Sequence, residues 1–305
     1  MAGTAANTFL KPDVIASTAL GLLERELVLG NLVWSDGAFD FAGAKNDTVT
    51  IRIPAQLTAR EYDWRNDRSA EIVLDNLAED SISVTLNKDI YSAVSVTDEE
   101  LTLDIKDFGS QVLSPQVKAV ATAIDTGVAS MIEGATYAST ATMDPADPYF
   151  GIIDARAALN KANVDVGGRK LLIGSDVETA LLKSNRISNV ANSGSDSALR
   201  DATVGRLAGF DLVVSNAIAP GAAYAFTRSA FVLATRAPAI PQGASFGASQ
   251  SYNGLSMRWI KDYDSARLRD RSIVNIYAGY NVMTDKVGAA KKLVRAVKLN
   301  LGTGA

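Results

Sequence analysis

Apolar residues near the start of the chain recur at the spacing of a helix. From Asp13 to about Gly30 they fall three or four positions apart, which places them on one helical face. Asp13 can cap the start of this helix, and Gly30 can end it. Two roles fit such a helix: it packs on the chain's own core, or it docks as an arm on a neighbouring subunit. Residues 1–12 are small and polar, which favours an extended arm.

The strongest helical stripe lies in the middle of the chain. Ser114 is a favoured N-cap residue, and Pro115 suits the first helical position. Gly134 is a natural stop. The apolar positions between them follow the helical period and are Val117, Val120, Ala121, Ile124, Val128 and Met131. The pattern predicts one helix of about 20 residues, roughly 30 Å long. A further helix is expected over residues 147–163.

Strict alternation of apolar and polar residues predicts two strands on either side of a long connection. The first strand is Thr48–Ile53, which Pro54 ends, and the second is Ser81–Leu86. Hairpin loops usually have about two to five residues, so this connection is abnormally long for a compact domain. Its centre carries the charged side chains Arg60, Glu61, Asp63, Arg65, Asp67 and Arg68. The connection is either a mobile surface loop or a charged projecting hairpin that lies over another subunit.

The rest of the chain is predicted to form short strands and helices. Thr97–Glu100 and Ser175–Glu178 have the pattern of a capping box, and each is expected to open a helix. A polar loop is expected at residues 188–202. The basic tail Lys286–Lys298 is expected to form a partly amphipathic surface helix. The expected strands, of which the last two pair, are residues 87–97, 170–173, 210–214, 223–227, 231–233, 255–263 and 272–280.

Composition narrows the chemistry that the chain can perform. The 305 residues include no histidine and no cysteine. This excludes Cys-based zinc sites, iron–sulfur clusters, disulfides, a catalytic thiol and a Ser-His-Asp triad. It also leaves no side chain whose unperturbed pKa lies near neutral pH. Because no other acid–base–nucleophile constellation is visible, the sequence predicts a protein without catalytic residues, cofactor or metal.

The charge balance bears on possible partners. A net charge of −4 and a pI of about 5.1 argue against tight nucleic-acid binding by the whole chain. The tail lysines could contact nucleic acid or an acidic neighbour, although exposed lysines on a surface helix need neither. The basic residues concerned are Lys286, Lys291, Lys292, Arg295 and Lys298. No apolar run is long enough to span a membrane, and the N-terminus lacks the pattern of a signal peptide, so we expect synthesis in the cytoplasm.

One pair of carboxylates needs a separate interpretation. Asp262 and Asp264 would point to the same face of a strand, as in some oxygen-ligand metal sites. Basic residues follow directly at Arg267, Arg269 and Arg271, so the alternative is a charged hairpin held by salt bridges.

The order of these elements resembles the major capsid (coat) proteins of tailed bacteriophages with the Hong Kong 97-type fold, and most of all the podovirus gene-5 coat proteins. The resemblance rests on the hairpin TVTIRIPAQ…SISVTLNKDIYSAVSVTDEEL, the helix from Ser114 to Gly134, and the stretches VGRLAGFDLVVSNAIAPGAAYAFTRSAFVLAT and GLSMRWIKDYDSARLRDRSIVNIYAGYNVM. It implies an α+β fold with an N-arm, an extended E-loop hairpin, a P-domain with a long spine helix, and an A-domain.

The resemblance also implies how the chain is divided. Residues 1–45 would form the N-terminal arm, and residues 46–97 would form the E-loop hairpin with its flanking strands. The P-domain would take residues 98–165, with its spine helix at 114–134, and the A-domain would take residues 166–244. The returning P-domain strands and the C-terminal tail would occupy residues 245–305.

The function implied is that of a structural shell protein. Copies would assemble as hexamers and pentamers into an icosahedral shell around phage double-stranded DNA, which they contact weakly and non-specifically. Arg60, Glu61, Asp63, Arg65, Asp67 and Arg68 would be inter-subunit contacts. Scaffolding protein and portal would take part in assembly in the host cytoplasm, a decoration protein is a further partner, and no membrane is involved. The alternatives are an encapsulin-like bacterial nanocompartment shell and an oxygen-ligand metal enzyme that uses Asp262 and Asp264.

Overall fold

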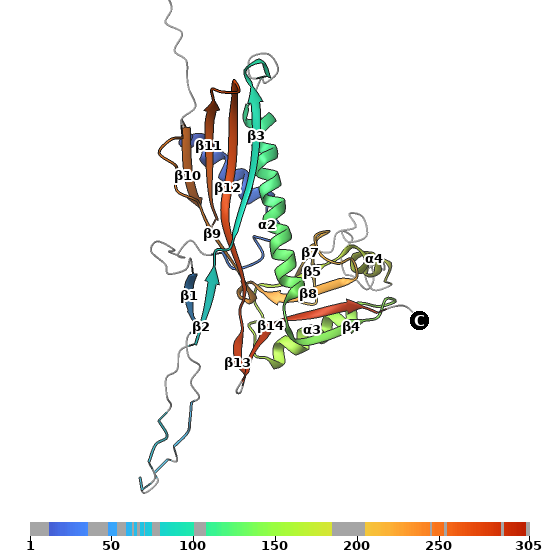
Figure 1. The fold of residues 1–305 in the computed structure, drawn as a ribbon. Helices are drawn as coiled ribbons and strands as arrows, with labels where there is room; N and C mark the ends of the chain where they lie inside the picture. Colours follow the sequence, from blue (N-terminus) through green and yellow to red (C-terminus); the bar gives the residue numbers. More distant parts are fainter. Residues whose placement is uncertain are drawn as a thin grey trace, which may run out of the picture.

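The computed structural model of this chain combines two large sheets, a separate two-stranded hairpin and four α-helices among the described residues (Figure 1). The α+β class expected from the sequence is confirmed. The predicted arm at residues 1–11 and the polar loop at 188–202 lie outside the described residues. The structure describes residues 12–35, 48–53, 59–62, 64–65, 68–69, 71–74, 80–100, 108–184, 205–244, 246–252, 255–287 and 290–302.

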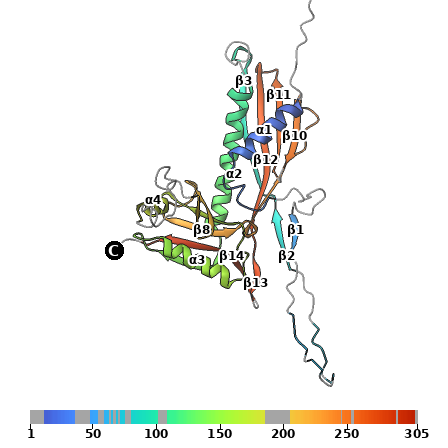
Figure 2. The same cartoon turned by 180° about the vertical axis from the view of Figure 1, so that it is seen from behind.

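The first sheet has five antiparallel strands, and two helices cover one of its faces (Figures 1 and 2). The strand order is β10-β11-β12-β3, and β9 pairs with the end of β12. Helix α1 lies across α2 and packs on β10 and β11, so it packs on the chain's own core. The bounds are α1 Pro12–Glu26, α2 Ser114–Gly134, β3 Lys88–Thr97, β9 Phe231–Arg236, β10 Phe246–Tyr252, β11 Leu255–Asp264 and β12 Arg269–Val282.

Helix α2 buries the apolar stripe that its sequence predicts, and β12 faces it with alternating buried residues. The buried apolar side chains of α2 include Val117, Val120, Ile124, Val128 and Ile132. On β12 the buried positions Val274, Ile276 and Ala278 alternate, as the pleat of a strand requires. Gln116 is buried between them, and its amide donates to the carbonyls of Ser92 and Ser272 at 3.1 and 2.9 Å. Its polar group is therefore satisfied within the core.

The start of α2 differs from the sequence prediction. A π-helical turn, Gly109–Leu113, runs directly into α2, and Ser114 already has helical angles (φ −60°, ψ −47°). Its N–H donates to the carbonyl of Gly109, so the prediction that Ser114 is the N-cap is wrong. The preceding turn supplies the carbonyl acceptor, and no side-chain cap is needed. Gly134 ends the helix as expected.

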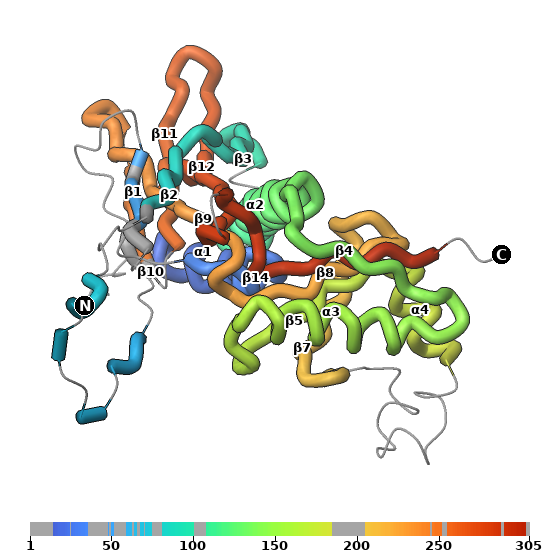
Figure 3. The backbone as a smooth tube through the Cα atoms, turned by 90° about the horizontal axis from the view of Figure 1, so that it is seen from below, coloured from blue at the N-terminus to red at the C-terminus, as the bar shows by residue number. Residues whose placement is uncertain are grey.

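The second sheet runs across the axis of α2, as the view along that helix shows (Figure 3). Its strand order is β13-β14-β8-β5-β7-β6, and β4 pairs with β14 in parallel. Helix α3 packs on β14 and β4. The bounds are β4 Tyr137–Met143, α3 Tyr149–Lys161, β5 Arg169–Ile173, α4 Ser175–Lys183, β6 Arg206–Leu207, β7 Phe210–Val214, β8 Ala222–Thr227, the 3₁₀ turn η4 Arg228–Ala230, β13 Asp285–Val287 and β14 Ala290–Leu301.

Two further sequence predictions are corrected by this sheet. The basic tail is not a surface helix, because it forms β13 and β14. These strands pair with each other, and β14 also pairs with β8. Ser175 begins α4, but Gly174 is its N-cap and no side chain caps it, so the capping box predicted there is absent. The box at Thr97 is confirmed: Thr97 N–H donates to Glu100 Oε2 at 2.9 Å, and Glu100 N–H donates to Thr97 Oγ1 at 3.3 Å.

Sheet membership also departs from the residue ranges that the resemblance implies. Strand β14 lies in the second sheet, and its residues fall in the range 245–305, where the returning P-domain strands and the C-terminal tail are expected. Strand β9 lies in the first sheet, although its residues fall in the range 166–244. Each of the two sheets therefore pairs strands that are distant in sequence.

Residues 27–35, here called the strap, connect α1 toward the separate hairpin and cross the middle of α2. Asp125 on α2 accepts the N–H of Val28 and the N–H of Gly30, both at 2.9 Å. Trp34 N–H donates to the carbonyl of Phe231 at 3.0 Å, which joins the strap to β9. A carboxylate that accepts hydrogen bonds from nearby backbone N–H groups orders a turn whose N–H groups would otherwise lack acceptors. The strap is therefore fixed to both α2 and the first sheet.

Two helical glycines provide a matched test of the packing around α2. A Cβ on Gly127 would lie 2.4 Å from the Tyr280 hydroxyl oxygen, whereas a Cβ on Gly21 in α1 would meet nothing within 4 Å. We expect Gly127→Ala to lower the free energy of unfolding by about 1–2 kcal/mol, because the tyrosine must move. Gly21→Ala should raise it by about 0.5–1 kcal/mol. Denaturant unfolding checks both values, and equal effects of the two variants would contradict this account.

The strap carboxylate predicts a pH dependence. Burial raises the pKa of the Asp125 carboxyl above its ordinary value, against the opposing effect of the N–H groups of Val28 and Gly30. Between the unfolded and the raised folded pKa the native state holds more protons, so this group's contribution to stability falls as pH rises. In denaturant unfolding from about pH 3.5 to 7, Asp125→Asn should therefore gain stability relative to the parent chain with rising pH. A difference that stays constant or shrinks would contradict the assignment.

Candidate functional site

A two-stranded hairpin stands apart from both large sheets. It consists of β1 (Thr48–Ile53) and β2 (Asp80–Thr85), which pair antiparallel along their whole length. The hydroxyl groups of Thr48 and Thr85 share a hydrogen bond of 2.8 Å at its open end. The described residues of the connecting loop lie beyond the other end, away from both sheets (Figure 1). We call residues 54–79 the projecting loop.

The base of this hairpin is attached through a small apolar cluster and a close backbone contact. Ile82 and Val84 are buried in a cluster with Val232, Ala234 and Met283. A Cβ on Gly279 of β12 would lie 2.4 Å from the carbonyl oxygen of Thr85, so only glycine lets the chain cross there.

Two side chains complete the attachment of the hairpin. Asn281 Nδ2 donates to the carbonyl of Ser83 at 2.5 Å, and Lys291 Nζ donates to the carbonyl of Ser81 at 3.4 Å. Next to them lies a cleft of about 650 Å³, which Ile82, Gly134 and Asn281 help to line. Neither strand of the hairpin enters a large sheet, so apart from the short link from β2 to β3, where Asn87 N–H donates to the carbonyl of Ala278, side chains and packing join the hairpin to the body.

The described part of the projecting loop exposes large apolar side chains. Trp64 is 85% exposed and Leu74 is 83% exposed, and Ile72 and Val73 beside Leu74 are also exposed. Arg60 Nη1 donates to the carbonyl of Val73 at 3.1 Å and so links the two legs of the loop. Such exposed apolar groups on an extension mark a surface that another molecule covers.

The charged residues singled out by sequence all belong to this loop, with some outside the described residues. Arg60, Glu61, Arg65 and Arg68 are exposed, while Asp63 and Asp67 lie outside the described residues. The Arg68 guanidinium lies over the Tyr62 ring, 5.1 Å from its centroid. Arg65 and Arg68 have φ angles of 59° and 56°, which are uncommon for non-glycine residues. Sequence analysis did not single out the exposed apolar residues of this loop, although the apolar run Ile72-Val73-Leu74 within a charged connection indicates them.

The paired carboxylates on β11 have cations as partners. Asp262 accepts Arg271 Nη2 at 2.5 Å, and Asp264 accepts Arg267 Nη1 at 3.1 Å. The Arg267 contact lowers the pKa of the Asp264 carboxyl. The arrangement is the salt-bridged hairpin that was weighed against a metal site. Among the described residues no group of three Asp or Glu side chains is placed to hold a metal ion.

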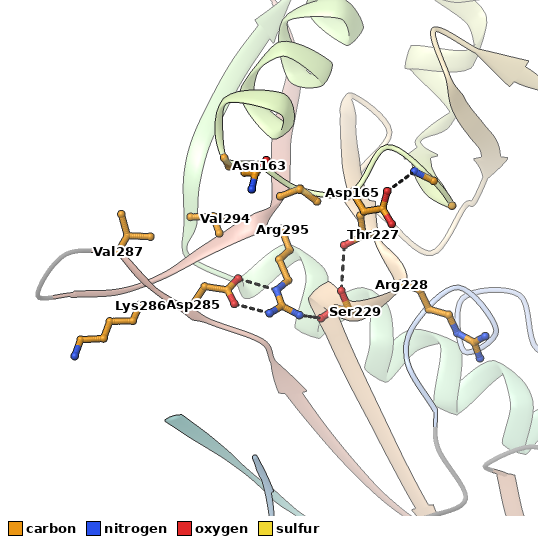
Figure 4. A pocket seen from close by; sticks show the side chains of 14 residues that line it. Asn163, Asp165, Thr227, Arg228, Ser229, Asp285, Lys286, Val287, Val294 and Arg295 are labelled. Carbon is orange, nitrogen blue, oxygen red and sulfur yellow. Dashed lines mark hydrogen bonds and ion pairs between the residues drawn. The ribbon is translucent and has the colours of Figure 1, made fainter. Parts of the chain in front are cut away.

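A recess of about 480 Å³ lies near β13 and β14, and several residues that line it bond to one another (Figure 4). Arg295 holds both carboxylate oxygens of Asp285 at 2.5 and 2.7 Å. The hydroxyls of Thr227 and Ser229 lie 3.4 Å apart. Asp165 accepts the N–H of Gly167 at 3.1 Å. These pairs join chain segments to one another, and the residues that line the recess do not include a nucleophile next to a general base.

Other side chains have pKa values that are shifted by burial or by a neighbouring charge. Burial raises the pKa of Tyr224 to about 12 and that of Tyr280 to about 12. The Lys170 ammonium, whose Nζ lies 2.8 Å from Asp211, lowers the pKa of the Asp211 carboxyl. Within the described part of the chain, no helix is both long and apolar enough to cross a membrane.

Comparison with known proteins places this architecture. The sequence profile of the phage capsid protein family matches residues 81–291. A solved structure from Mycobacterium phage Che8 has a TM-score of 0.64 at 19% identity, over 90% of this chain and 91% of that chain. The capsid structure of cyanophage P-SCSP1u has a TM-score of 0.61 at 12% identity, over 100% of this chain and 92% of that chain. The structure of a virus-like particle from Pyrococcus furiosus has a TM-score of 0.51 at 12% identity, over 94% of this chain and 97% of that chain. No curated protein sequence matches.

The matching profile, together with this fold, therefore defines a subunit of a protein shell, a structural protein of the viral capsid class. Since the profile covers more than half of the chain, the chain belongs to the phage capsid protein family, and the resemblance to tailed-phage major capsid proteins is confirmed.

The exposed apolar run predicts a contrast within the hairpin. Replacing Ile72, Val73 and Leu74 together by serine should change the free energy of unfolding by no more than about 0.5 kcal/mol, because these side chains are solvated in the subunit. Ile82→Ala at the buried base should cost about 2 kcal/mol or more. Thermal and denaturant unfolding of the soluble subunit measure both. A large loss in the triple serine variant would show that the run packs within its own chain.

Proposed function

We propose that this chain is the major capsid protein of a tailed bacteriophage and that copies close into an icosahedral shell of hexamers and pentamers around double-stranded DNA. The observation that carries the proposal is the projecting loop, which holds large apolar side chains in solvent far from its own core. Exposing them in a lone subunit forgoes the stabilisation that their burial gives, and a neighbouring copy supplies that burial. Family membership is consistent with this role.

In this proposal the projecting loop is the E-loop and lies over the next subunit. Arg60, Glu61, Arg65 and Arg68 form a polar rim beside the apolar contact. Asp63 and Asp67, which lie outside the described residues, are further candidates for inter-subunit contact. Trp64 and the run from Ile72 to Leu74 form its centre, as in interfaces whose apolar core is ringed by polar groups.

The two large sheets take the other roles of the family. The first sheet with α1 and α2 is the P-domain, and α2 is its spine helix. The second sheet with α3 and α4 is the A-domain, to which β14 returns after the last long strand of the P-domain. The N-arm precedes them. This division follows sheet membership and replaces the consecutive residue ranges that the resemblance implies.

The protein acts by assembly, without catalysis, cofactor or metal. Scaffolding protein and portal assist assembly in the host cytoplasm, and a decoration protein is a candidate partner of the finished virion capsid. The packaged DNA is contacted weakly and non-specifically, which suits a chain whose net charge is −4. No membrane takes part.

A second candidate is an encapsulin-like bacterial nanocompartment shell. The similarity to the virus-like particle from Pyrococcus furiosus favours it, at a lower TM-score than the Mycobacterium phage and cyanophage structures. Purified particles distinguish the two candidates, since a compartment would hold a cargo enzyme where a capsid holds DNA and a portal.

Deleting Ala59–Ser69 tests the proposed role of the loop. We expect the parent chain to form closed megadalton particles by size-exclusion chromatography and electron microscopy. The deletion should leave a soluble folded subunit, because the loop lies outside the core, yet impair shell formation or stability. Replacing the same residues by a Gly/Ser segment of equal length is the control for loop length. Normal shells from the deletion would contradict the assigned role.

Shell formation by the parent chain is itself the test of the function. Only small oligomers under all conditions, with or without scaffolding protein, would overturn it.

A further inference from the structure

Strand β3 forms one edge of the first sheet. It pairs with β12 on one side, and within the described part of the chain no strand lies on its other side. The strand has ten residues, Lys88–Thr97, whereas a typical strand has about five or six. We call its unpaired side the open edge. Such an edge presents backbone N–H and C=O groups that a further strand can bind.

The open edge lacks the features that usually protect an edge strand from pairing. Charged residues, prolines and bulges are the common devices. The stretch Ile90–Thr97 contains no charged residue, no proline and no glycine, and the ladder with β12 runs in unbroken register. Ala93, Val94 and Ser95 are exposed in succession, so both faces of the strand are uncovered there. Tyr91 on the same strand is exposed as well.

The sheet's other edge, at β10, has a different character. Helix α1 packs on β10, and the exposed side chains in the middle of this strand are the hydroxyl groups of Ser249 and Ser251. The open edge of β3 instead exposes the apolar groups of Tyr91 and Val94. Cross-strand contacts between apolar side chains stabilise strand pairs, so the edge at β3 suits an apolar partner.

The projecting loop contains a segment with the complementary property. Ile72, Val73 and Leu74, here called the apolar leg, belong to neither a helix nor a strand. All three side chains are exposed, so neither side of the leg is packed. Two of the three are β-branched, which favours a strand. The leg therefore has the sequence of a strand but lies outside every sheet.

The leg cannot reach the open edge of its own chain. Strand β2 leads directly into β3, and the projecting loop begins at the opposite end of β2. A strand of six residues is about 20 Å long. The described residues of the loop lie beyond that end, directed away from the first sheet (Figure 1). A leg that pairs with β3 must therefore come from another copy.

We propose that the apolar leg of one copy pairs as an added strand with the open edge of β3 in a neighbouring copy. This rests on the proposed function, since it needs neighbouring copies in a shell. Backbone hydrogen bonds supply affinity in such strand addition, and the alternating side chains supply specificity. The contact joins two different surfaces, so it can repeat from copy to copy around a ring.

Disulfide trapping tests the pairing directly, because the chain contains no cysteine. One set of variants carries a single cysteine in the leg, and a second set carries one on β3. One variant from each set is assembled together, and the shells are oxidised. A disulfide forms only where the two Cα atoms lie within about 7 Å of each other. The substitutions are Ile72→Cys, Val73→Cys and Leu74→Cys in the leg, and Ser92→Cys, Ala93→Cys, Val94→Cys and Ser95→Cys on β3.

The mixed shells should give a disulfide-linked dimer on non-reducing electrophoresis that neither variant gives alone. The register with β12 places Ser92 and Val94 on the face toward α2, and Ala93 and Ser95 on the other face. Because side chains alternate along a strand, Val73→Cys should link to positions of one face only. The cysteines that replace its two neighbours in the leg should link to the other face.

Ser249→Cys on β10 is the matched control, since it is exposed on the sheet's other edge and should not link. Shells without any linked dimer would overturn the pairing, as would equal linking to Ser249→Cys or linking without alternation between the faces. The cysteine-free parent chain is assembled in the same assay. Its failure to form shells would overturn the proposed function and the pairing with it, whereas shells without links overturn the pairing alone.

Discussion

One continuous apolar core along α2 holds the two sheets together. Val117 and Ile124 pack toward the first sheet, and the same cluster includes Leu172, Tyr224 and Leu293 of the second sheet. A separate cluster fills the other face of the second sheet, beneath α3. Because the shared core crosses both sheets, neither can complete its packing without α2, and the two behave as one cooperative unit. The strap adds hydrogen bonds to Asp125 at the middle of the helix.

The projecting hairpin depends on that unit and contributes little to it. Only its base reaches a buried cluster, and this cluster is small. The described part of the long loop beyond the base has the exposure expected of a segment whose packing partner is another molecule. This division explains why the chain shows a well-built core together with large apolar side chains in solvent, a combination that would be costly in a protein that worked alone.

Local patterns in the sequence were sufficient for elements with one buried face. The stripe of α2 and the alternation of β1 and β2 each appear in the structure where periodicity predicts them. The prediction for the basic tail was wrong because β14 is buried on both faces. Leu293, Ala296 and Val297 are all buried, so the two-residue period of a half-exposed strand is lost. Its parallel pairing with β4 joins residues far apart in sequence, which no local pattern encodes. At the candidate site, attention to charge identified the projecting loop but passed over Trp64 and the run beside Leu74.

The attachment of the hairpin has a consequence for symmetry. A closed shell built from one chain places that chain in surroundings that are similar but not identical, around fivefold and sixfold positions. A backbone ladder would impose one angle on the hairpin, whereas Asn281 and Lys291 grip it through side chains that can change rotamer. The tight crossing at Gly279 fixes where the hairpin leaves the body, and the side-chain grip leaves its direction adjustable. A joint of this kind lets a single sequence satisfy several local geometries at small energetic cost.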